Sequence, residues 1–463
     1  MNSMLIKSRT PTHPRSTDRK EPLKLAMLGA GSAFSVSVLE TLDDPVFEGC
    51  AFWIMDIQAS SLERAEGALR TRMKERDIRV HLSATTDLRA ALDGADYVIV
   101  SCEQDRYRNW IQDIEIPAQH GVEQLIGENG GPGGQIHAMR NINMLMPIVA
   151  AMTELCPEAW LLNLTNPMSI LCTYLSKYTP IKFAGFCHQV HGTVGVIAEQ
   201  LGFEAGELEV ISGGINHLNW LFDIRRRGTA KSCLPEFIEA ISASAWWKPH
   251  QDAEVPEHAF SLEVFRTFGM YPLGYDNHIC EYFSCFYEKE EWARFGITPL
   301  LESRLRPQVE SRKTTLEAQH LMGGAGKQYP FPKNPQNPYY RESVSPVIVA
   351  LETNRPLYLD AMVGRNGGAI SNLPPDAVVD RPVVVVGGEV RSIHVGSLPP
   401  GPLEICRRQI ALHDMVAQAT VEGDERLAVQ ALCLDPYVRS ITQARNIWAD
   451  FRKHYASSLP SFG

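Results

Sequence analysis

Two short segments carry side chains that could hold a metal ion. Cys187, His188 and His191 follow a strand-like run in AGFCHQVHG, and His217 lies thirty residues after Cys187 in GGINHLNW. A thiolate and an imidazole from separate loops can bind a divalent ion and leave positions open for substrate oxygens, which suits a Lewis-acid role. The spacing leaves a second interpretation open, in which each of these side chains is packed or hydrogen-bonded in the core.

A glycine-rich segment near the start indicates a dinucleotide site. LAMLGAGS contains Gly29, Gly31 and Ser32 after an apolar run, and these glycines permit a tight turn and a close backbone approach to a pyrophosphate. Asp56 ends the next strand-like run, where it can accept hydrogen bonds from a ribose and repel a 2′-phosphate, which favours NAD over NADP. Because the third glycine position holds Phe34, a parallel sheet without a dinucleotide remains an alternative.

Asparagines follow other strand-like runs. Asn163 and Asn166 lie at the end of the run in LLNLTNPMSI, and the carboxyl ends of strands in open α/β sheets face the ligand crevice. Asn163 is therefore a candidate for cofactor contact and Asn166 for substrate contact, although Asn-Pro is also a common turn signal. The run GENGGPGG, residues 127–134, is a candidate substrate-site loop with Asn129 near the ligand, or else a surface turn.

The elements that must position these residues alternate between strands and helices. Strand-like runs in LKLAMLGA, AFWIMDI and ADYVIVS are separated by helix-like spacing at Val36–Leu42, Ser61–Arg76 and Leu88–Leu92. This alternation is typical of βαβ units around a parallel sheet. The segment Pro402–Phe451 has the spacing of amphipathic helices, which we expect to pack the second domain. Residues 323–337, dense in Gly, Pro and Asn, predict a long loop.

Composition excludes several classes of function. The 463 residues are 44% hydrophobic and 21% charged, as in a globular chain of two or three domains. Lys and Arg total 44 against 54 Asp and Glu, and the net charge of -10 argues against binding to nucleic acid or anionic membranes. No apolar run approaches the ~20 residues of a membrane span, and the start lacks the apolar core of a signal peptide. Ten cysteines without a CxxC pair fit reduced thiols, so we expect a cytoplasmic protein.

The order of several motifs resembles one family. GAGS, GENGGPGG, NLTNP, CHQVHG, GINHLNW, FGMYPLGYDNHICEY and NGGAISNLPPDAVV follow one another as in the NAD- and metal-dependent glycoside hydrolases of family 4, from about Leu23 to Phe451. The resemblance implies an α/β fold: a Rossmann-type parallel sheet like that of lactate and malate dehydrogenases, then a mixed α/β catalytic and oligomerisation domain. We expect a flexible extension at 1–22, the NAD-binding domain at 23–215 and the second domain at 216–463, assembled as homodimers or homotetramers.

The resemblance also implies an unusual hydrolysis that does not use paired carboxylates. NAD+ takes a hydride from C3 of the sugar, and the divalent ion, for which Mn2+ is expected, polarises the resulting ketone. The C2 proton becomes acidic, a base removes it, the aglycone leaves, water adds at C1, and the hydride returns to C3.

Individual residues match the family's motifs. Cys187 and His217 match the metal ligands, and Asn166 matches a residue that contacts the sugar. His188 occupies the position of the acid that assists the leaving group. Cys-His at this position resembles members that act on unphosphorylated α-glucosides, α-galactosides or α-uronides, whereas 6-phosphoglycosidases carry Asp or Asn after the cysteine. Asn216, beside His217 in the Asn-His pair, is a further candidate for substrate contact.

The base is expected within residues 268–282, where Tyr271 is the first candidate and Asp276 the second, with Tyr275 also present. In the same segment, His278 and Glu281 could bind metal-bound water or sugar hydroxyls, or be structural.

Arg106 and Arg108 could pair with a uronate carboxylate or be solvated charges. Two other functions remain open on the sequence alone. A sugar or 2-hydroxy-acid dehydrogenase with net hydride transfer would leave Cys187 and His217 unexplained, and an NAD-sensing protein would not need them.

Overall fold

The computed structural model describes residues 22–32, 34–242, 258–286, 289–307, 309 and 344–463. Almost all of the predicted extension at 1–22 and the whole predicted loop at 323–337 lie outside these residues. Within the described part of the chain, no helix is both long enough and apolar enough to cross a membrane.

The first half of the described chain forms a parallel sheet. Its strands run in the spatial order β3-β2-β1-β4-β5-β6, and every neighbouring pair is parallel. The strands are β1 (Lys24–Leu28), β2 (Ala51–Met55), β3 (His81–Thr85), β4 (Tyr97–Val100), β5 (Trp160–Asn163) and β6 (Lys182–Gly185). This is the strand order of a dinucleotide-binding Rossmann sheet, so the predicted fold class is confirmed.

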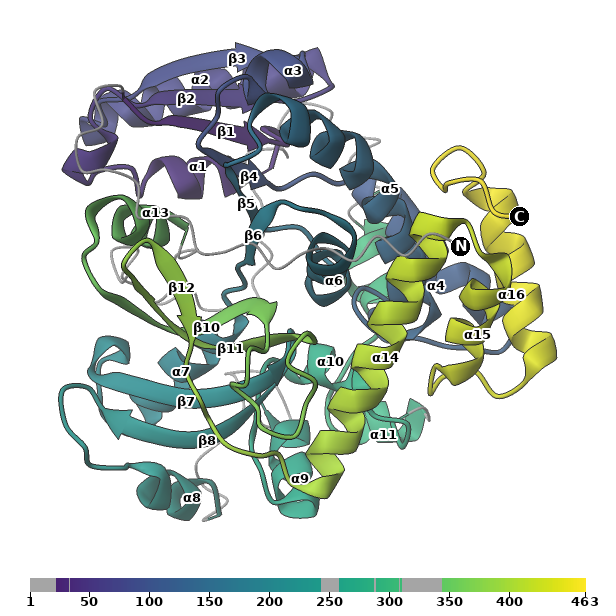
Figure 1. The fold of residues 1–463 in the computed structure, drawn as a ribbon. Helices are drawn as coiled ribbons and strands as arrows, with labels where there is room; N and C mark the ends of the chain where they lie inside the picture. The colour runs from purple at the N-terminus through teal and green to yellow at the C-terminus, as the bar shows by residue number, and fades with distance from the viewer. Residues whose placement is uncertain (1–21, 33, 243–257, 287–288, 308, 310–343) are drawn as a thin grey trace.

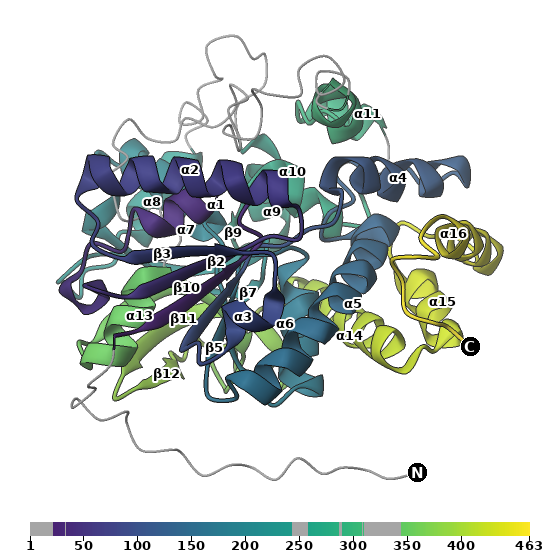
Figure 2. The same cartoon turned by 90° about the horizontal axis from the view of Figure 1, so that it is seen from above.

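Helices cover both faces of this sheet, as Figure 2 shows. They are α1 (Phe34–Leu39), α2 (Ala59–Arg76), α3 (Leu88–Leu92), α5 (Gly131–Leu155) and α6 (Met168–Tyr178), whereas α4 (Arg106–Gln119) packs against α5 beyond the sheet. Alternate residues of β1 serve different cores, since Leu25 and Met27 pack with the α1 and α2 side while Ala26 and Leu28 pack with the α3, α5 and α6 side. A strand buried on both faces must be apolar throughout, which explains the continuous run in its sequence.

The sheet continues into an antiparallel half (Figure 1). After β6 the order is β10-β11-β7-β8-β9, with β12 paired to β11. These strands are β7 (Leu208–Ile215), β8 (Leu218–Arg226), β9 (Pro272–Leu273), β10 (Leu357–Arg365), β11 (Val378–Val386) and β12 (Glu389–Ser392). The accompanying helices are α7 (Gln189–Gln200), α8 (Leu234–Ser242), α9 (Ala259–Phe268), α10 (Asp276–Ile279), α11 (Lys289–Arg294) and α13 (Val344–Thr353).

The domain division expected at residue 215 falls in the turn between β7 and β8, which pair along their whole length. Since a boundary there would split a hairpin, we propose that the second domain begins before β7.

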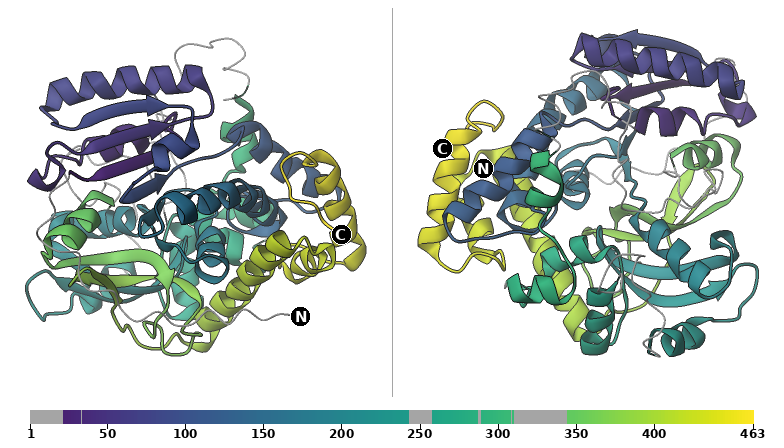
Figure 3. Two further views of the ribbon diagram at one scale, coloured as in Figure 1. Left: turned by 45° about the horizontal axis from the view of Figure 1, so that its top comes forward. Right: turned by 180° about the vertical axis from the view of Figure 1, so that it is seen from behind.

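The C-terminal helices are α14 (Pro400–Glu422), α15 (Glu425–Leu434) and α16 (Ile441–His454), and they lie beside α5 (Figure 3). Contrary to expectation, they do not pack mainly on the second domain, because Val416, Ile447 and Phe451 share a core with α5 and α6. Only the first part of α14, with Ile405 and Ile410, packs in the core of the antiparallel half. The long α14 therefore joins the two halves.

Candidate active site

The turn after β1 has the geometry that the glycine motif predicts. Gly29 has φ +86°, and a Cβ on it would lie 2.2 Å from the carbonyl oxygen of Ser101, so glycine is required there. The N–H of Gly31 donates to Oδ2 of Asp56 at 2.9 Å, and the hydroxyls of Ser32 and Ser101 lie 2.7 Å apart. The turn after β1 is thus tied to the carboxyl ends of both neighbouring strands, β2 and β4.

A side chain of the loop after β5 hydrogen-bonds to the backbone of the same loop. The Asn163 amide donates to the carbonyl oxygen of Thr165 at 2.9 Å and accepts from the Thr165 N–H at 3.2 Å, and the Asn163 side chain is fully buried. Asn163 therefore shapes the loop, which argues against the predicted direct contact with a cofactor. Oδ1 of Asn166, in contrast, is buried without a hydrogen-bond partner among the described residues, so it can accept a bond from a ligand.

One row of paired residues joins the ends of β6 and β7 across the sheet. Gly185 pairs with Val363, Val363 with Asp380, and Asp380 with Gly214. Cys187 and His217 consequently lie two and three residues, respectively, beyond this row.

His217 lies in the two-residue turn of the β7–β8 hairpin, after Asn216. Its φ of +68° is in the left-handed region, which costs a non-glycine residue about 1–3 kcal/mol and is concentrated at functional sites. The turn is held from both sides, because the N–H of Asn216 donates to the Ser169 hydroxyl at 3.2 Å and the Tyr282 hydroxyl donates to the Asn216 carbonyl at 3.1 Å.

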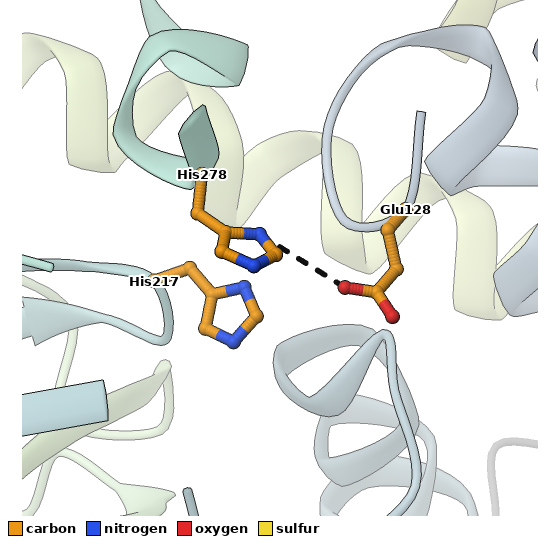
Figure 4. Close-up of side chains that lie close together, drawn as sticks. All are labelled: Glu128, His217 and His278. Carbon is orange, nitrogen blue, oxygen red and sulfur yellow. Dashed lines mark ion pairs between the residues drawn. The ribbon is translucent and has the colours of Figure 1, made fainter. Parts of the chain in front are cut away.

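His217 points toward Glu128 and His278 (Figure 4). One potential ligand atom from each of the three lies within 4.8 Å of the others. The two imidazole rings have centroids 4.3 Å apart, and Nδ1 of His278 is 3.9 Å from Oε2 of Glu128. Glu128 belongs to the loop GENGGPGG, so this loop lines the cluster through Glu128, the residue before the predicted Asn129.

Charged side chains surround Glu128. The Arg106 guanidinium lies 2.9 Å from Oε1 of Glu128 and 3.3 Å from Oε2 of Glu103, so two carboxylates already share its charge. Arg108 is 72% exposed beside Asp105. Neither arginine is therefore arranged as a ready partner for a uronate or phosphate.

Family models for glycosyl hydrolases match most of the sequence. The model "Family 4 glycosyl hydrolase" matches residues 24–203, and the model of its C-terminal domain matches residues 212–438. The chain belongs to family 4 of the glycosyl hydrolases. The family predicted from the order of the motifs is thus confirmed.

Relatives of this family 4 hydrolase carry the names of three α-glycosidase activities, alpha-glucosidase, alpha-galactosidase and alpha-galacturonidase. An alpha-glucosidase of Erwinia rhapontici is 28% identical over 450 residues, which cover 89% of this chain and 93% of the relative. An alpha-galactosidase of Bacillus subtilis is 29% identical over 428 residues, covering 92% and 95%. A solved 6-phospho-beta glucosidase of Thermotoga maritima with manganese, NAD+ and glucose-6-phosphate has a TM-score of 0.77 at 19% identity, covering 95% and 100%, and this likeness shows the fold.

Burial sets the charge state of the histidines in this family 4 site. Burial, together with His278 and His188, lowers the pKa of His217 well below its usual value, so its imidazole is neutral and able to bind a metal. Burial opposes the charged form of His137 too, but Glu103, 2.8 Å away, outweighs it and raises the pKa of His137. Burial raises the pKa of the Glu281 carboxyl against the opposing effect of His278.

Cys187 and His188 occupy the turn between β6 and α7 of the hydrolase. Cys187 is half-buried beside the core that contains Met168 and Val363, and it is not a member of the group formed by Glu128, His217 and His278. The carbonyl of His188 accepts the N–H of Gly192 at 2.8 Å as α7 begins. Their roles as metal ligand and acid stay predictions.

The two first candidates for the base are placed unfavourably. Tyr271 is 2% exposed in an apolar core, where its ring meets that of Phe237 edge-on with the ring centroids 5.1 Å apart. Burial raises the pKa of Tyr271 well above the usual value, which opposes its use as a base. Asp276 accepts the N–H of Phe260 at 2.8 Å and the N–H and hydroxyl of Ser261 at 2.9 and 2.5 Å, so its carboxylate caps α9. These contacts assign both residues structural roles.

Tyr275 and Gln189 are two further candidates for the site. Tyr275 is half-buried, and a Cβ on Gly192 would lie 2.4 Å from its hydroxyl, so the hydroxyl rests against the first turn of α7. Gln189 is 3% exposed, and neither atom of its amide has a hydrogen-bond partner among the described residues. Its position directly after Cys187 and His188 is the signal that could have identified it.

The other predicted substrate residues touch buried carboxyls. Asn129 donates to Oε2 of Glu128 at 3.0 Å, and Asn216 lies against Asp380, whose pKa burial raises to about 6 against the opposing effects of Arg381 and Asn216. Their contacts with a substrate stay predictions.

Proposed function

We propose that this family 4 hydrolase cleaves unphosphorylated α-glycosides with NAD and a divalent metal ion, without net oxidation of the sugar. The observation that carries the proposal is the placement of His217, a buried neutral imidazole with an unpartnered Nδ1. Its hairpin pairs with β11, which is joined to the Rossmann sheet through β10. A dehydrogenase needs the nucleotide-binding turn but gives no reason for this buried cluster.

The residues fit both groups. The turn at Gly29 has no room for a Cβ beside Ser101, as the tight turn of a dinucleotide-binding motif requires, and Asp56 at the end of β2 is oriented by Gly31 for a ribose. His217 supplies the metal-binding nitrogen, with the thiolate of Cys187 as the predicted second ligand. When bound, NAD supplies hydride transfer at C3 of the sugar and the metal ion supplies stabilisation of the neighbouring oxygen.

The protein's own residues supply binding and proton transfer. We assign proton removal at C2 to Tyr275, because its hydroxyl lies against the turn that carries His188, and protonation of the leaving oxygen to His188. The buried amides of Asn166 and Gln189 have unsatisfied atoms that suit sugar hydroxyls. Such amides orient a neutral sugar without adding charge.

An unphosphorylated substrate is supported by the Cys187–His188 pair and by Arg106, whose charge is engaged by Glu103 and Glu128. The names of the alpha-glucosidase and alpha-galactosidase relatives agree with this class. Gluco-, galacto- and uronide-configured sugars remain the candidates, because further relatives are named alpha-galacturonidase.

The proposal also includes a cellular compartment and an oligomeric state. A thiolate ligand at Cys187 requires a reducing compartment, which supports a cytoplasmic location. We also propose a homodimer or homotetramer, which light scattering of the purified chain would measure.

The test is turnover of a panel of aryl α-glycosides and α-uronides by the purified chain. We expect hydrolysis only when both NAD and Mn2+ are present, and no accumulation of NADH. Stoichiometric NADH would instead support the dehydrogenase, and hydrolysis by cofactor-free protein would contradict the proposal.

A further inference from the structure

Three metal-ligand side chains come together from distant parts of the chain. Glu128 lies in the loop between α4 and α5, His217 in the β7–β8 turn, and His278 in α10 (Figure 4). Glu128 is 2% exposed and His217 is 6% exposed, and the His278 side chain is 19% exposed. Buried polar groups require partners, so their convergence needs an explanation.

The separation of these side chains fits an ion better than a direct ion pair. Nδ1 of His278 is 3.9 Å from Oε2 of Glu128, beyond hydrogen-bond distance. By comparison, Nε2 of the neighbouring His137 lies 2.8 Å from Oε1 of Glu103, which is a direct ion-pair distance. Two atoms that each bind one ion at about 2.1 Å are at most about 4.2 Å apart. The His278–Glu128 distance falls within this limit. The ligand atoms of the whole group lie within 4.8 Å of one another, so the most distant pair would have to approach by at most about 0.6 Å to bind one ion.

Unsatisfied atoms point to the same conclusion. Nδ1 of His217 and Nδ1 of His278 are both buried without a hydrogen-bond partner among the described residues. An unpaired buried polar group costs about 1–3 kcal/mol, a cost that a bound ion would offset where it takes a ring nitrogen as ligand.

A second layer of contacts holds the ligands in place. Oε1 of Glu281 accepts the backbone N–H of Glu128 at 3.1 Å, and Oε2 of Glu281 lies 3.9 Å from Nδ1 of His278. Arg106 and Asn129 bind the two carboxylate oxygens of Glu128 at 2.9 and 3.0 Å. Outer contacts that orient histidine and carboxylate ligands are typical of metal sites.

We propose that Glu128 and His278 bind the same divalent cation as His217. Two imidazoles and one carboxylate leave coordination positions for substrate oxygens, and Cys187 can fill one position without displacing them. The inference rests on the proposed function only through the shared residue His217, and it adds a carboxylate and a second imidazole to the expected Cys187–His217 pair.

The test is Mn2+ binding by the metal-stripped full chain, measured from the loss of the free Mn2+ signal in electron paramagnetic resonance. We expect Glu128→Gln and His278→Gln each to weaken Mn2+ binding at least about tenfold. The matched controls are Glu115→Gln, at a partly exposed carboxylate paired with Arg306, and His454→Gln, at an exposed histidine of α16. Both controls should bind Mn2+ within twofold of the original chain.

Pulsed electron paramagnetic resonance of the Mn2+-loaded original chain provides a readout that does not depend on the folding of any variant. We expect two coordinated imidazole nitrogens, one of which is lost in His278→Gln. A single coordinated nitrogen, or unchanged Mn2+ affinity in both Glu128→Gln and His278→Gln while Cys187→Ala abolishes binding, would overturn the inference and leave the proposed function intact. An original chain that binds no Mn2+ would contradict both.

Discussion

The carboxylate of Asp56 accepts the N–H of Gly31 at 2.9 Å, so the acid that ends β2 is held by the turn that follows β1. Its other oxygen accepts the N–H of Gln58 at 2.9 Å. Two backbone donors fix the carboxylate at the carboxyl edge of the sheet, where the ribose of a dinucleotide binds in this fold. The residue that we propose to select the cofactor is therefore also hydrogen-bonded to the turn that we propose to receive its phosphates.

Replacement of Asp56 by Ala should weaken NAD binding at least about tenfold, since both the ribose acceptor and the bond to Gly31 are lost. Discrimination against NADP should fall as well. Isothermal titration with both cofactors measures this. Asp77→Asn, at an 82% exposed side chain after α2, is the control and should bind NAD normally. NAD affinity equal in Asp56→Ala and the control would remove Asp56 from the site.

Gly29→Ala should abolish NAD binding and destabilise the protein, because the new Cβ would lie 2.2 Å from the Ser101 carbonyl oxygen. Gly49→Ala is a matched control, with φ +72° but nothing within 4 Å of the added Cβ. It should cost only the backbone strain of about 1 kcal/mol. Chemical denaturation of both variants separates backbone strain from steric clash. Equal losses of unfolding free energy in the two variants would contradict the clash at Gly29.

Tyr275→Phe should lower kcat by about 10²–10⁴-fold if this hydroxyl removes the C2 proton. Tyr271→Phe should leave kcat within a few-fold of the original value and reduce stability by about 1 kcal/mol, because that hydroxyl is buried away from solvent. Steady-state kinetics with an aryl α-glycoside distinguishes the two. A large kcat loss in Tyr271→Phe alone would restore the first candidate for the base.

Arg140→Ala should destabilise the fold by about 3–5 kcal/mol, because it leaves Asp113 charged and buried without its partner. The pair is bidentate at 2.6 and 2.7 Å, and the Tyr455 hydroxyl donates to the same carboxylate at 2.6 Å. The exposed pair of Arg70 and Glu66 provides the comparison, and Arg70→Ala should cost at most about 1 kcal/mol. Similar unfolding free energies for the two variants would contradict this account.

Stability should fall as the pH falls from about 6.5, in part because of His413. Burial lowers the pKa of His413 to about 3, so between that pH and 6.5 the unfolded chain binds a proton that the folded chain does not. At pH 5 the loss from this one group is about 2 kcal/mol. In His413→Leu the difference in unfolding free energy between pH 7 and pH 5 should shrink by this amount, whereas His454→Gln should leave it unchanged.

The sequence predicted the nucleotide-binding half well because its signals are local. The apolar runs around Gly29 and Asp56 each complete a strand within a few residues, and parallel pairing follows from the alternation of strands and helices. The departure at Phe34 did not alter the result, since that residue begins α1 rather than entering the turn.

The metal-ligand cluster could not be predicted in the same way. Glu128, His217 and His278 are brought together from a loop, a hairpin turn and the short helix α10, and no spacing along the chain encodes their approach. The ranking of Tyr271 and Asp276 as candidates for the base rests on their positions in the sequence, which do not reveal side-chain direction. Asp276 caps a helix that precedes it in the chain, which reverses the usual order of a capping signal.

The most direct test of the central claim is hydrolysis of an aryl α-glycoside in deuterated water. If the reaction passes through a C3 ketone and removal of the C2 proton, the released sugar carries deuterium at C2, and mass spectrometry or NMR detects it. A released sugar with only its original hydrogen at C2, formed at the full NAD- and Mn2+-dependent rate, would contradict the claim.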